Sequence, residues 1–249
     1  MANFALFMEM VRIAVVGLGR VGKHLIRAFS PYAHVTGVQS RSLSGLPHDA
    51  DIYFITVPDS VIGAVSMKVR NEIDSGLLVH VSAATSIDVL PAGNGGRGVF
   101  YPLQTFSDET DMDYRSVPVF VEGDSPKTVE FLRYVGKLFS DNVREADLEY
   151  RLRLHVAAVL ACNCVNRLFV HADRILNDLD TDIRIMWPLI NETVKKLQTM
   201  TPLEAQTGPA ARGDRNTVDL HLAILEAKPQ TQQIYRIISN DIQDECSRL

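Results

Sequence analysis

Apolar and polar residues follow two different periods along this chain, and the first half alternates short apolar runs with helical patterns. The runs are rich in valine and isoleucine, which is typical of parallel strands covered on both faces. They cover residues 12–16, 34–39, 51–57, 77–82, 98–101 and 117–121, and a helix is expected over 126–139. Pro118 in the last run indicates an edge strand. This order predicts an α/β domain with a mostly parallel, doubly wound sheet.

The second half has only helical patterns. Neither glycine nor proline occurs from Lys137 to Trp187, and residues 147–179 form one helical pattern, which would be about 50 Å long. Because residues 156–165 are apolar on almost every face, this helix needs neighbours on all sides. Further helical patterns cover residues 183–200, 216–226 and 232–246. We therefore predict an α/β domain at residues 1–146 and an all-α domain at 147–249, which completes its burial as a homodimer.

Charge and composition exclude several classes of protein. The chain has 30 acidic and 25 basic side chains and a net charge of −5, with no basic stripe, so a nucleic-acid partner is not expected. Residues 156–170 are too few to span a bilayer, and residues 1–10 lack the cationic leader of a signal peptide. We expect a soluble, cytoplasmic protein without a membrane partner.

Cys162 and Cys164 point to different helix faces, so they are expected to be buried small hydrophobes and not metal ligands.

The first apolar run leads directly into a glycine-rich turn and then into a helix. The turn reads Gly17-Leu18-Gly19-Arg20-Val21-Gly22. Gly17 permits the tight turn, Gly19 leaves room for a pyrophosphate, and Gly22 lets the helix pack close to the strand. The free N–H groups of the helix would bind the phosphates. The context predicts a dinucleotide-binding site over residues 17–22.

The end of the second strand indicates which dinucleotide binds. An NAD site usually has a carboxylate about 20 residues after the glycines, but no acidic residue occurs between Glu9 and Asp49. The strand leads instead into Ser40-Arg41-Ser42, where a guanidinium and two hydroxyls suit a 2′-phosphate. We therefore predict NADP(H), the alternative being that Arg41 is a solvated loop cation. The other expected coenzyme contacts are at later strand ends, at Val57, Pro58 and Ser82.

Polar side chains in apolar surroundings are the first candidates for chemistry. His155 and Asn163 interrupt the apolar part of the long helix and could orient a substrate or deliver a proton. The structural alternative is a satisfied core histidine and an amide that ties two helices together.

Two loops and one helix supply further candidates. Tyr101 could donate a proton and Gln104 and Thr105 could contact substrate, because ligands bind at strand ends in open α/β sheets; an ordinary strand exit is the alternative. In the loop after residue 200, Thr207, Arg212 and Asp214 are candidates for substrate binding, with Arg212 suited to a carboxylate. This loop could also be a plain connection in which Asp214 caps the next helix. His221, on that helix, is a further general-acid candidate.

Several of these segments together resemble a known family. They are Gly17–Gly22, Tyr101–Phe106, the Leu154–Val159 stretch with Asn163, and Thr207-Gly-Pro-Ala-Ala-Arg-Gly-Asp214 followed by His221. The set resembles Rossmann-like proteins with a C-terminal helical domain of unknown function. These are relatives of pyrroline-5-carboxylate reductase, NADP oxidoreductases and the 6-phosphogluconate dehydrogenase superfamily. The resemblance implies an N-terminal NADP domain, a 6-phosphogluconate dehydrogenase C-terminal-like helical dimerisation domain, and a site in the cleft between them.

The chain departs from this pattern at two positions. Val159 stands where the hydroxyacid dehydrogenases have a catalytic lysine, and Tyr101 stands where relatives have histidine. We expect an NADP(H)-dependent oxidoreductase that reduces a small C=O or C=N compound with a carboxylate, similar to ketopantoate or a pyrroline carboxylate. The alternative is a non-catalytic NADP(H)-binding sensor or scaffold.

Overall fold

A computed structural model describes residues 10–108 and 112–248 of the chain. Of residues 1–10, which were predicted not to be a signal peptide, only Met10 lies among the described residues. The chain divides into two compact units, residues 1–159 and 160–249. Helix α4 (Leu148–Ala158) thus belongs to the first unit. The domain boundary predicted between residues 146 and 147 stays a prediction, because grouping by contacts does not identify the functional domains.

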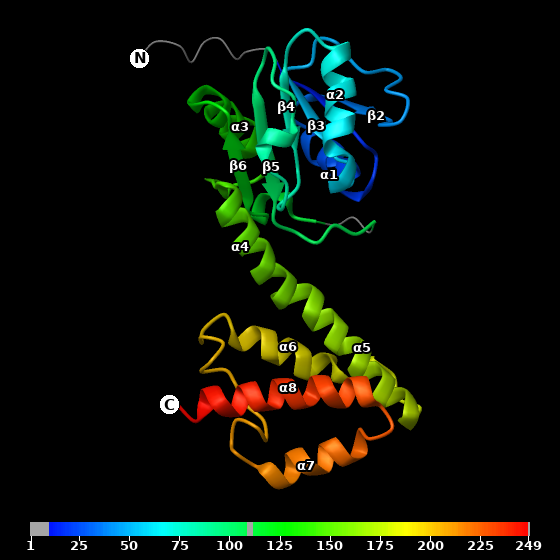
Figure 1. Cartoon of the computed structure of the whole chain (residues 1–249), viewed down its shortest axis with the longest axis vertical. Helices are drawn as coiled ribbons and strands as arrows, with labels where there is room; N and C mark the ends of the chain where they lie inside the picture. The colour runs from blue at the N-terminus through cyan, green and yellow to red at the C-terminus, as the bar shows by residue number, and fades with distance from the viewer. Residues whose placement is uncertain (1–9, 109–111, 249) are drawn as a thin grey trace. The chain divides into compact units, whose positions relative to one another are not determined.

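The first unit is built on a seven-stranded sheet in the order β2-β1-β3-β4-β5-β6-β7 (Figure 1). The strands are β1 Arg12–Val16, β2 His34–Val38, β3 Ile52–Ile55, β4 Leu77–His80, β5 Arg97–Pro102, β6 Val119–Gly123 and β7 Val143–Glu145. Strands β1 to β5 run parallel, β6 pairs antiparallel with β5, and β7 pairs parallel with β6. The predicted doubly wound, mostly parallel sheet is confirmed.

Alternate residues of each strand face opposite layers of helices, as the two-residue period of a strand requires. On one face, Val15, Phe54 and Phe100 pack with buried residues of α1 (Arg20–Phe29) and α3 (Pro126–Phe139). On the other, Val16 and Ile55 pack with α2 (Ile62–Glu72). Helices α1 to α3 therefore cover both faces of the sheet. The edge formed by the carboxyl ends of the parallel strands is where open α/β sheets bind ligands.

One detail of the sheet differs from the prediction. Pro118 precedes β6 and does not mark an edge, because β7 pairs along the other side of β6. The β7 strand has three residues, Val-Arg-Glu, and only its first is apolar, so the sequence pattern gave no strand signal there.

The second half is helical, as predicted. After α4 (Leu148–Ala158), a π-helical turn at Val159–Cys164 leads into α5 (Val165–Leu176). Then follow α6 (Trp187–Lys196), α7 (Arg215–Ile224) and α8 (Pro229–Cys246), with α7 packed on α8 (Figure 1).

The long helix is poorly covered by the rest of the chain. Cys162 and Cys164 are exposed, contrary to the prediction that they are buried, because no other element described covers this part of the helix. Among the described residues, Leu148–Leu179 is also the one helical stretch long and apolar enough to cross a membrane by length and composition. Residues 156–170, which are too few to span a bilayer, are only part of this stretch. Its most apolar window is 6% buried within the chain.

Candidate functional site

The glycine-rich turn between β1 and α1 has the geometry of a phosphate cradle. Gly17 has φ +111°, and a Cβ there would lie 2.5 Å from the Thr56 carbonyl oxygen. A Cβ on Gly22 would lie 2.0 Å from the Gly17 carbonyl oxygen, whereas one on Gly19 would meet no atom within 4 Å. Two glycines are thus required by the fold, and the third leaves its surroundings open, which fits a pyrophosphate against bare backbone.

The rest of this turn is held by β3 and β2. The Thr56 hydroxyl donates to the Gly17 carbonyl oxygen at 2.6 Å, and the Gly17 N–H donates to the Val38 carbonyl oxygen at 2.9 Å. Gly19 caps α1 and has no side chain to bind the first N–H groups of the helix. Those donors therefore point to the turn and suit an anion. Leu18 and Val21 are half-buried beside them, and Arg20 is exposed.

The residues predicted to bind the 2′-phosphate of the ribose follow β2. Arg41 and Ser42 are exposed, and Ser40 is half-buried. The Ser42 hydroxyl accepts from the Ser44 N–H at 3.3 Å. Because β1 and β2 are parallel neighbours, residues 40–42 leave the same carboxyl edge of the sheet as the glycine-rich turn. The residues present fit an adenine dinucleotide with a 2′-phosphate.

The ends of β3 and β4 meet through Ser82. Its hydroxyl donates to the Asp59 carboxylate at 2.7 Å and accepts from the Thr85 hydroxyl at 2.9 Å and from the N–H groups of Ala84 and Thr85. With its hydrogen-bonding capacity filled by this loop, Ser82 shapes the wall of the site. Val57 and Pro58 lie at the corresponding end of β3, half-buried and exposed.

Tyr101 and His155 meet at the end of β5. The Tyr101 hydroxyl lies 3.3 Å from His155 Nδ1, and the two rings make an edge-on contact. Burial raises the pKa of Tyr101, so its hydroxyl stays protonated at neutral pH. Two of the four predicted catalytic side chains are therefore neighbours. Gln104 and Thr105 follow on the exposed strand exit, where the Gln104 side-chain oxygen accepts from the Thr105 N–H.

Arg151, which fastens α4 to the sheet, is not among the site residues predicted from sequence. Its side chain is fully buried, forms an ion pair with Glu122 of β6, and donates to the Ala146 and Thr85 carbonyl oxygens at 3.1 and 3.2 Å. His155 is one turn further along α4 on the same face. Arg151 thus fastens to the sheet the turn of α4 that precedes His155. Arg151 is charged and lies in a helical pattern typical of a solvent-exposed face, so the sequence did not indicate that its side chain is buried.

His80, at the end of β4, was also missed. It is fully buried, and its Nδ1 accepts from the Ser82 N–H at 3.2 Å. Burial, together with the smaller effect of the Arg151 charge, lowers the pKa of His80 to about 4. His80 is therefore neutral at physiological pH and is not an acid for catalysis. A histidine in an apolar strand is the signal that could have identified it.

The remaining candidates belong to the second unit. Asn163 is exposed on the π-helical turn, and Thr207 and Arg212 are exposed in the loop before α7. Asp214 caps α7, as the structural alternative proposed, by accepting from the Thr217 N–H and hydroxyl at 3.1 and 2.7 Å. These bonds lower the pKa of Asp214, with smaller contributions from Arg212 and His221.

Arg212 and Asp214 therefore lie at the start of α7, and His221 lies in its last turn. His221 Nδ1 is 2.7 Å from the Tyr235 hydroxyl of α8, which leaves Nε2 as its other polar atom.

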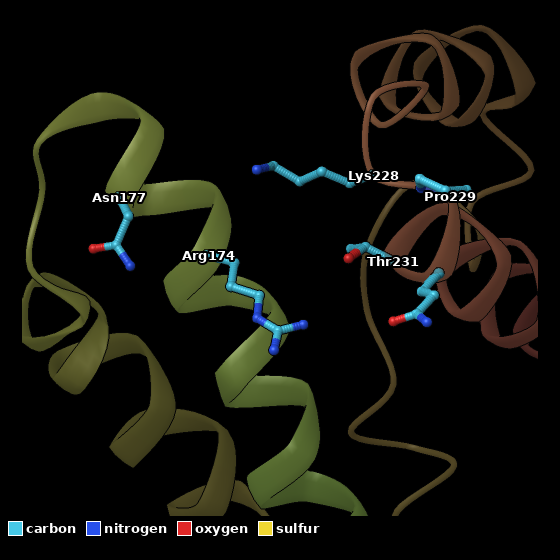
Figure 2. Close-up of a pocket in the computed structure, with 6 residues that line it drawn as sticks. Arg174, Asn177, Lys228, Pro229 and Thr231 are labelled. Atoms are coloured by element: carbon cyan, nitrogen blue, oxygen red, sulfur yellow. The ribbon is translucent and has the colours of Figure 1, made fainter.

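The second unit also contains a cavity of about 420 Å³, between the end of α5 and the start of α8 (Figure 2). None of the predicted site residues lines it. Its polar groups are largely paired: Lys228 with Asp178 at 2.7 Å, Thr231 with His171 at 2.8 Å, and Asn177 with Asp173 at 3.3 Å. We therefore do not assign chemistry to it.

Solved structures resemble the chain along almost its whole length. A candidate NADP oxidoreductase from Bacteroides fragilis is 28% identical with a TM-score of 0.84, and the match covers 94% of this chain and 98% of that one. Protein TM1727 from Thermotoga maritima is 19% identical with a TM-score of 0.72, covering 95% and 98%. The pyrroline carboxylate reductase of Plasmodium falciparum, with NADP bound, is 10% identical with a TM-score of 0.54, covering 94% and 97%.

The last two matches are below 25% identity and show the fold alone, a Rossmann-type domain followed by helices. Among curated proteins, none matches this chain. Residues 117–242, more than half of the chain, match a domain of unknown function, DUF2520. That match begins at the approach to β6 and ends within α8, so it includes Arg151, the Tyr101 partner His155, and the loop before α7. The chain is a member of the DUF2520 family.

Proposed function

We propose that this protein is an NADP(H)-dependent oxidoreductase that reduces a small C=O or C=N compound bearing a carboxylate. The observation that carries the proposal is the glycine-rich turn, in which Gly19 is open while Gly17 and Gly22 are enclosed. The 28% identity with the Bacteroides fragilis protein supports the same class of reaction.

The coenzyme would be held by the first unit. The N-terminal N–H groups of α1 would bind the pyrophosphate, and Arg41 with Ser40 and Ser42 would bind the 2′-phosphate. A nicotinamide coenzyme supplies the hydride for such a reduction, so the protein must polarise the acceptor and deliver a proton.

Delivery of this proton to the substrate is assigned to the Tyr101–His155 pair. Since Tyr101 keeps its hydroxyl proton and lies 3.3 Å from His155 Nδ1, it holds the orientation of the imidazole, and His155 gives a proton to the reduced oxygen or nitrogen. Arg212 is the candidate for the carboxylate of the substrate, with Asn163, Gln104, Thr105 and Thr207 as further polar contacts. His221 is the alternative proton donor.

The test combines coenzyme titration with a substrate screen. Keto acids and cyclic imines are offered with NADPH, and consumption of NADPH is followed by absorbance. We expect turnover with at least one compound, because the turn and the acid pair are both present. A protein that binds NADPH tightly and turns over none of these compounds would be a sensor or scaffold, and one that binds neither NADPH nor NADH would refute the proposal entirely.

The role of His155 is tested on the substrate so identified. His155→Ala should lower kcat by about 10²- to 10⁴-fold, the usual effect of losing a general acid, with the Kd for NADPH unchanged. Tyr101→Phe keeps the ring and removes the hydroxyl, so it should lower kcat less. Unchanged turnover in His155→Ala would remove His155 from the mechanism and leave His221 as the donor to test.

A further inference from the structure

Two side chains on one face of α1 contact the strand exit after β5. Arg20 and His24 are four residues apart, so they lie on the same side of the helix. His24 contacts Ser107, Phe106 and Tyr114, and Arg20 forms an ion pair with Asp108 at 3.5 Å. We call residues 103–108 the post-β5 segment. It contains Gln104 and Thr105, the predicted substrate contacts.

The hydrogen bonds of His24 determine its tautomer. The Ser107 carbonyl oxygen can only accept, so Nε2, at 2.6 Å from it, carries the proton. Nδ1 is then an acceptor, and the Tyr114 hydroxyl donates to it at 2.8 Å. The imidazole also contacts the Phe106 ring, with centroids 5.0 Å apart, and is 2% exposed. Nε2 and the ring contact with Phe106 thus hold the post-β5 segment, and the bond from Tyr114 to Nδ1 fixes the orientation of the imidazole.

Arg20 connects the same segment to the phosphate cradle. It is the first residue of α1, directly after Gly19, and its partner Asp108 lies within the post-β5 segment. Both side chains are mostly exposed, so the pair is weak. The Arg20 guanidinium has five N–H donors, so it can contact a pyrophosphate bound at the N-terminus of α1 while it stays paired with Asp108. Binding at the turn would therefore fix Arg20 and, through it, Asp108, while His24 keeps the second contact with the segment.

We propose that His24 is a positioning residue that couples the dinucleotide-binding helix to the post-β5 segment, so that coenzyme binding orders Gln104 and Thr105. This inference rests on the proposed function for its coenzyme, but the docking of the segment on His24 does not. The segment would then be anchored by His24 before coenzyme arrives and would be adjusted through Arg20 afterwards.

Hydrogen–deuterium exchange without coenzyme tests the docking. His24→Phe keeps an aromatic ring against Phe106 and removes both hydrogen bonds, so exchange in residues 103–108 should become about tenfold faster. Tyr114→Phe removes one bond and should give a smaller increase, which keeps the test available if His24→Phe folds poorly. His24→Gln restores a donor and should partly reverse the effect. Exchange in α3 serves as the control. Unchanged exchange in 103–108 for both His24→Phe and Tyr114→Phe would overturn the docking role.

The same measurement with NADPH tests the coupling. In the wild type, NADPH should slow exchange in the first turn of α1 and in residues 103–108; in His24→Phe, it should slow exchange only in α1. Equal protection of 103–108 in both proteins would overturn the coupling, as would wild-type binding that protects α1 alone. Absence of any NADPH binding would refute the proposed function and the coupling, while the coenzyme-free exchange would still decide the docking.

Discussion

At the scale of single residues, buried polar groups near the strand ends set the properties of the candidate site. His80 and Arg151 are both fully buried, although one is neutral and the other charged. Arg151 can stay charged because Glu122 and two carbonyl oxygens surround it. Losing one partner of such a pair leaves an unpaired buried charge and is strongly destabilising. The stability of this region is therefore sensitive to pH and to the loss of either partner.

His80 gives a specific pH dependence. Its pKa falls from 6.5 to about 4 on folding, so the unfolded chain binds more protons between these values. The stability it contributes is present above pH 6.5 and is lost as pH falls toward 4, which amounts to about 2 kcal/mol between pH 7.5 and pH 5. His80→Asn retains an acceptor for the Ser82 N–H but cannot titrate. Urea unfolding at several pH values should show a smaller loss for this variant, and parallel losses in both proteins would contradict the prediction.

Arg41 gives a prediction about coenzyme preference. If its guanidinium binds the 2′-phosphate, Arg41→Ala removes a charge-assisted hydrogen bond and should raise the Kd for NADPH about 10- to 100-fold. The Kd for NADH, which lacks that phosphate, should change little and is the internal control. Fluorescence titration of both coenzymes measures this. An equal effect on both, or none on NADPH, would show that Arg41 is a solvated loop cation.

At the scale of elements, the β1 turn and α1 combine a structural and a binding requirement in one short segment. Gly22→Ala would place a Cβ 2.0 Å from the Gly17 carbonyl oxygen, so we expect a loss of about 1–3 kcal/mol of stability. Gly19→Ala meets no atom within 4 Å and has an extended φ of −72°, so stability should change by less than about 0.5 kcal/mol.

For coenzyme affinity, measured per folded molecule, the order should be reversed: Gly19→Ala should have the larger effect. Gly19→Ala puts a methyl group where the pyrophosphate would approach and should weaken NADPH binding at least about tenfold. Thermal unfolding and titration on the same samples separate the two effects. A stable Gly19→Ala protein with wild-type affinity would show that the turn is a structural one.

Element types were largely predictable from sequence, and element details were not. The strands from β1 to β6 and the long helix follow from apolar runs and 3.6-residue periodicity. The β7 strand and the π-helical turn at Val159–Cys164 do not, because a three-residue strand is stabilised by its neighbour, and a π-helical turn leaves the apolar pattern unchanged.

At the scale of the whole molecule, apolar surface on the long helix remains uncovered by the described residues. Val156 is 59% and Leu160 is 62% exposed, one turn apart. A soluble protein rarely leaves such surface in water, so we propose that a second copy of this chain covers it. Arg151 of the same long helix forms an ion pair with Glu122 of the sheet, so the start of the helix packs on protein. This favours a protein partner over lipid.

Sedimentation velocity tests this assembly. The wild type should sediment as a dimer of the 27.7 kDa chain at micromolar concentration. Val156→Asp with Leu160→Asp should sediment as a monomer, because burying two carboxylates costs several kcal/mol, while Tyr150→Ser, also on an exposed position of α4, is the matched control. A monomeric wild type, or one that needs detergent to stay in solution, would contradict the proposal.

The sequence by itself determined the α/β-then-helical order, the glycine-rich turn and the absence of a carboxylate after β2, because these depend on local periodicity and on residues close together in the chain. Only the tertiary structure decided which side chains meet. Tyr101 and His155 are 54 positions apart and His24 and Ser107 are 83 apart, so no local pattern could pair them. Burial of His80 and Arg151 likewise depends on the packing of α4 on the strand ends, since a side chain loses water only when distant segments fold over it.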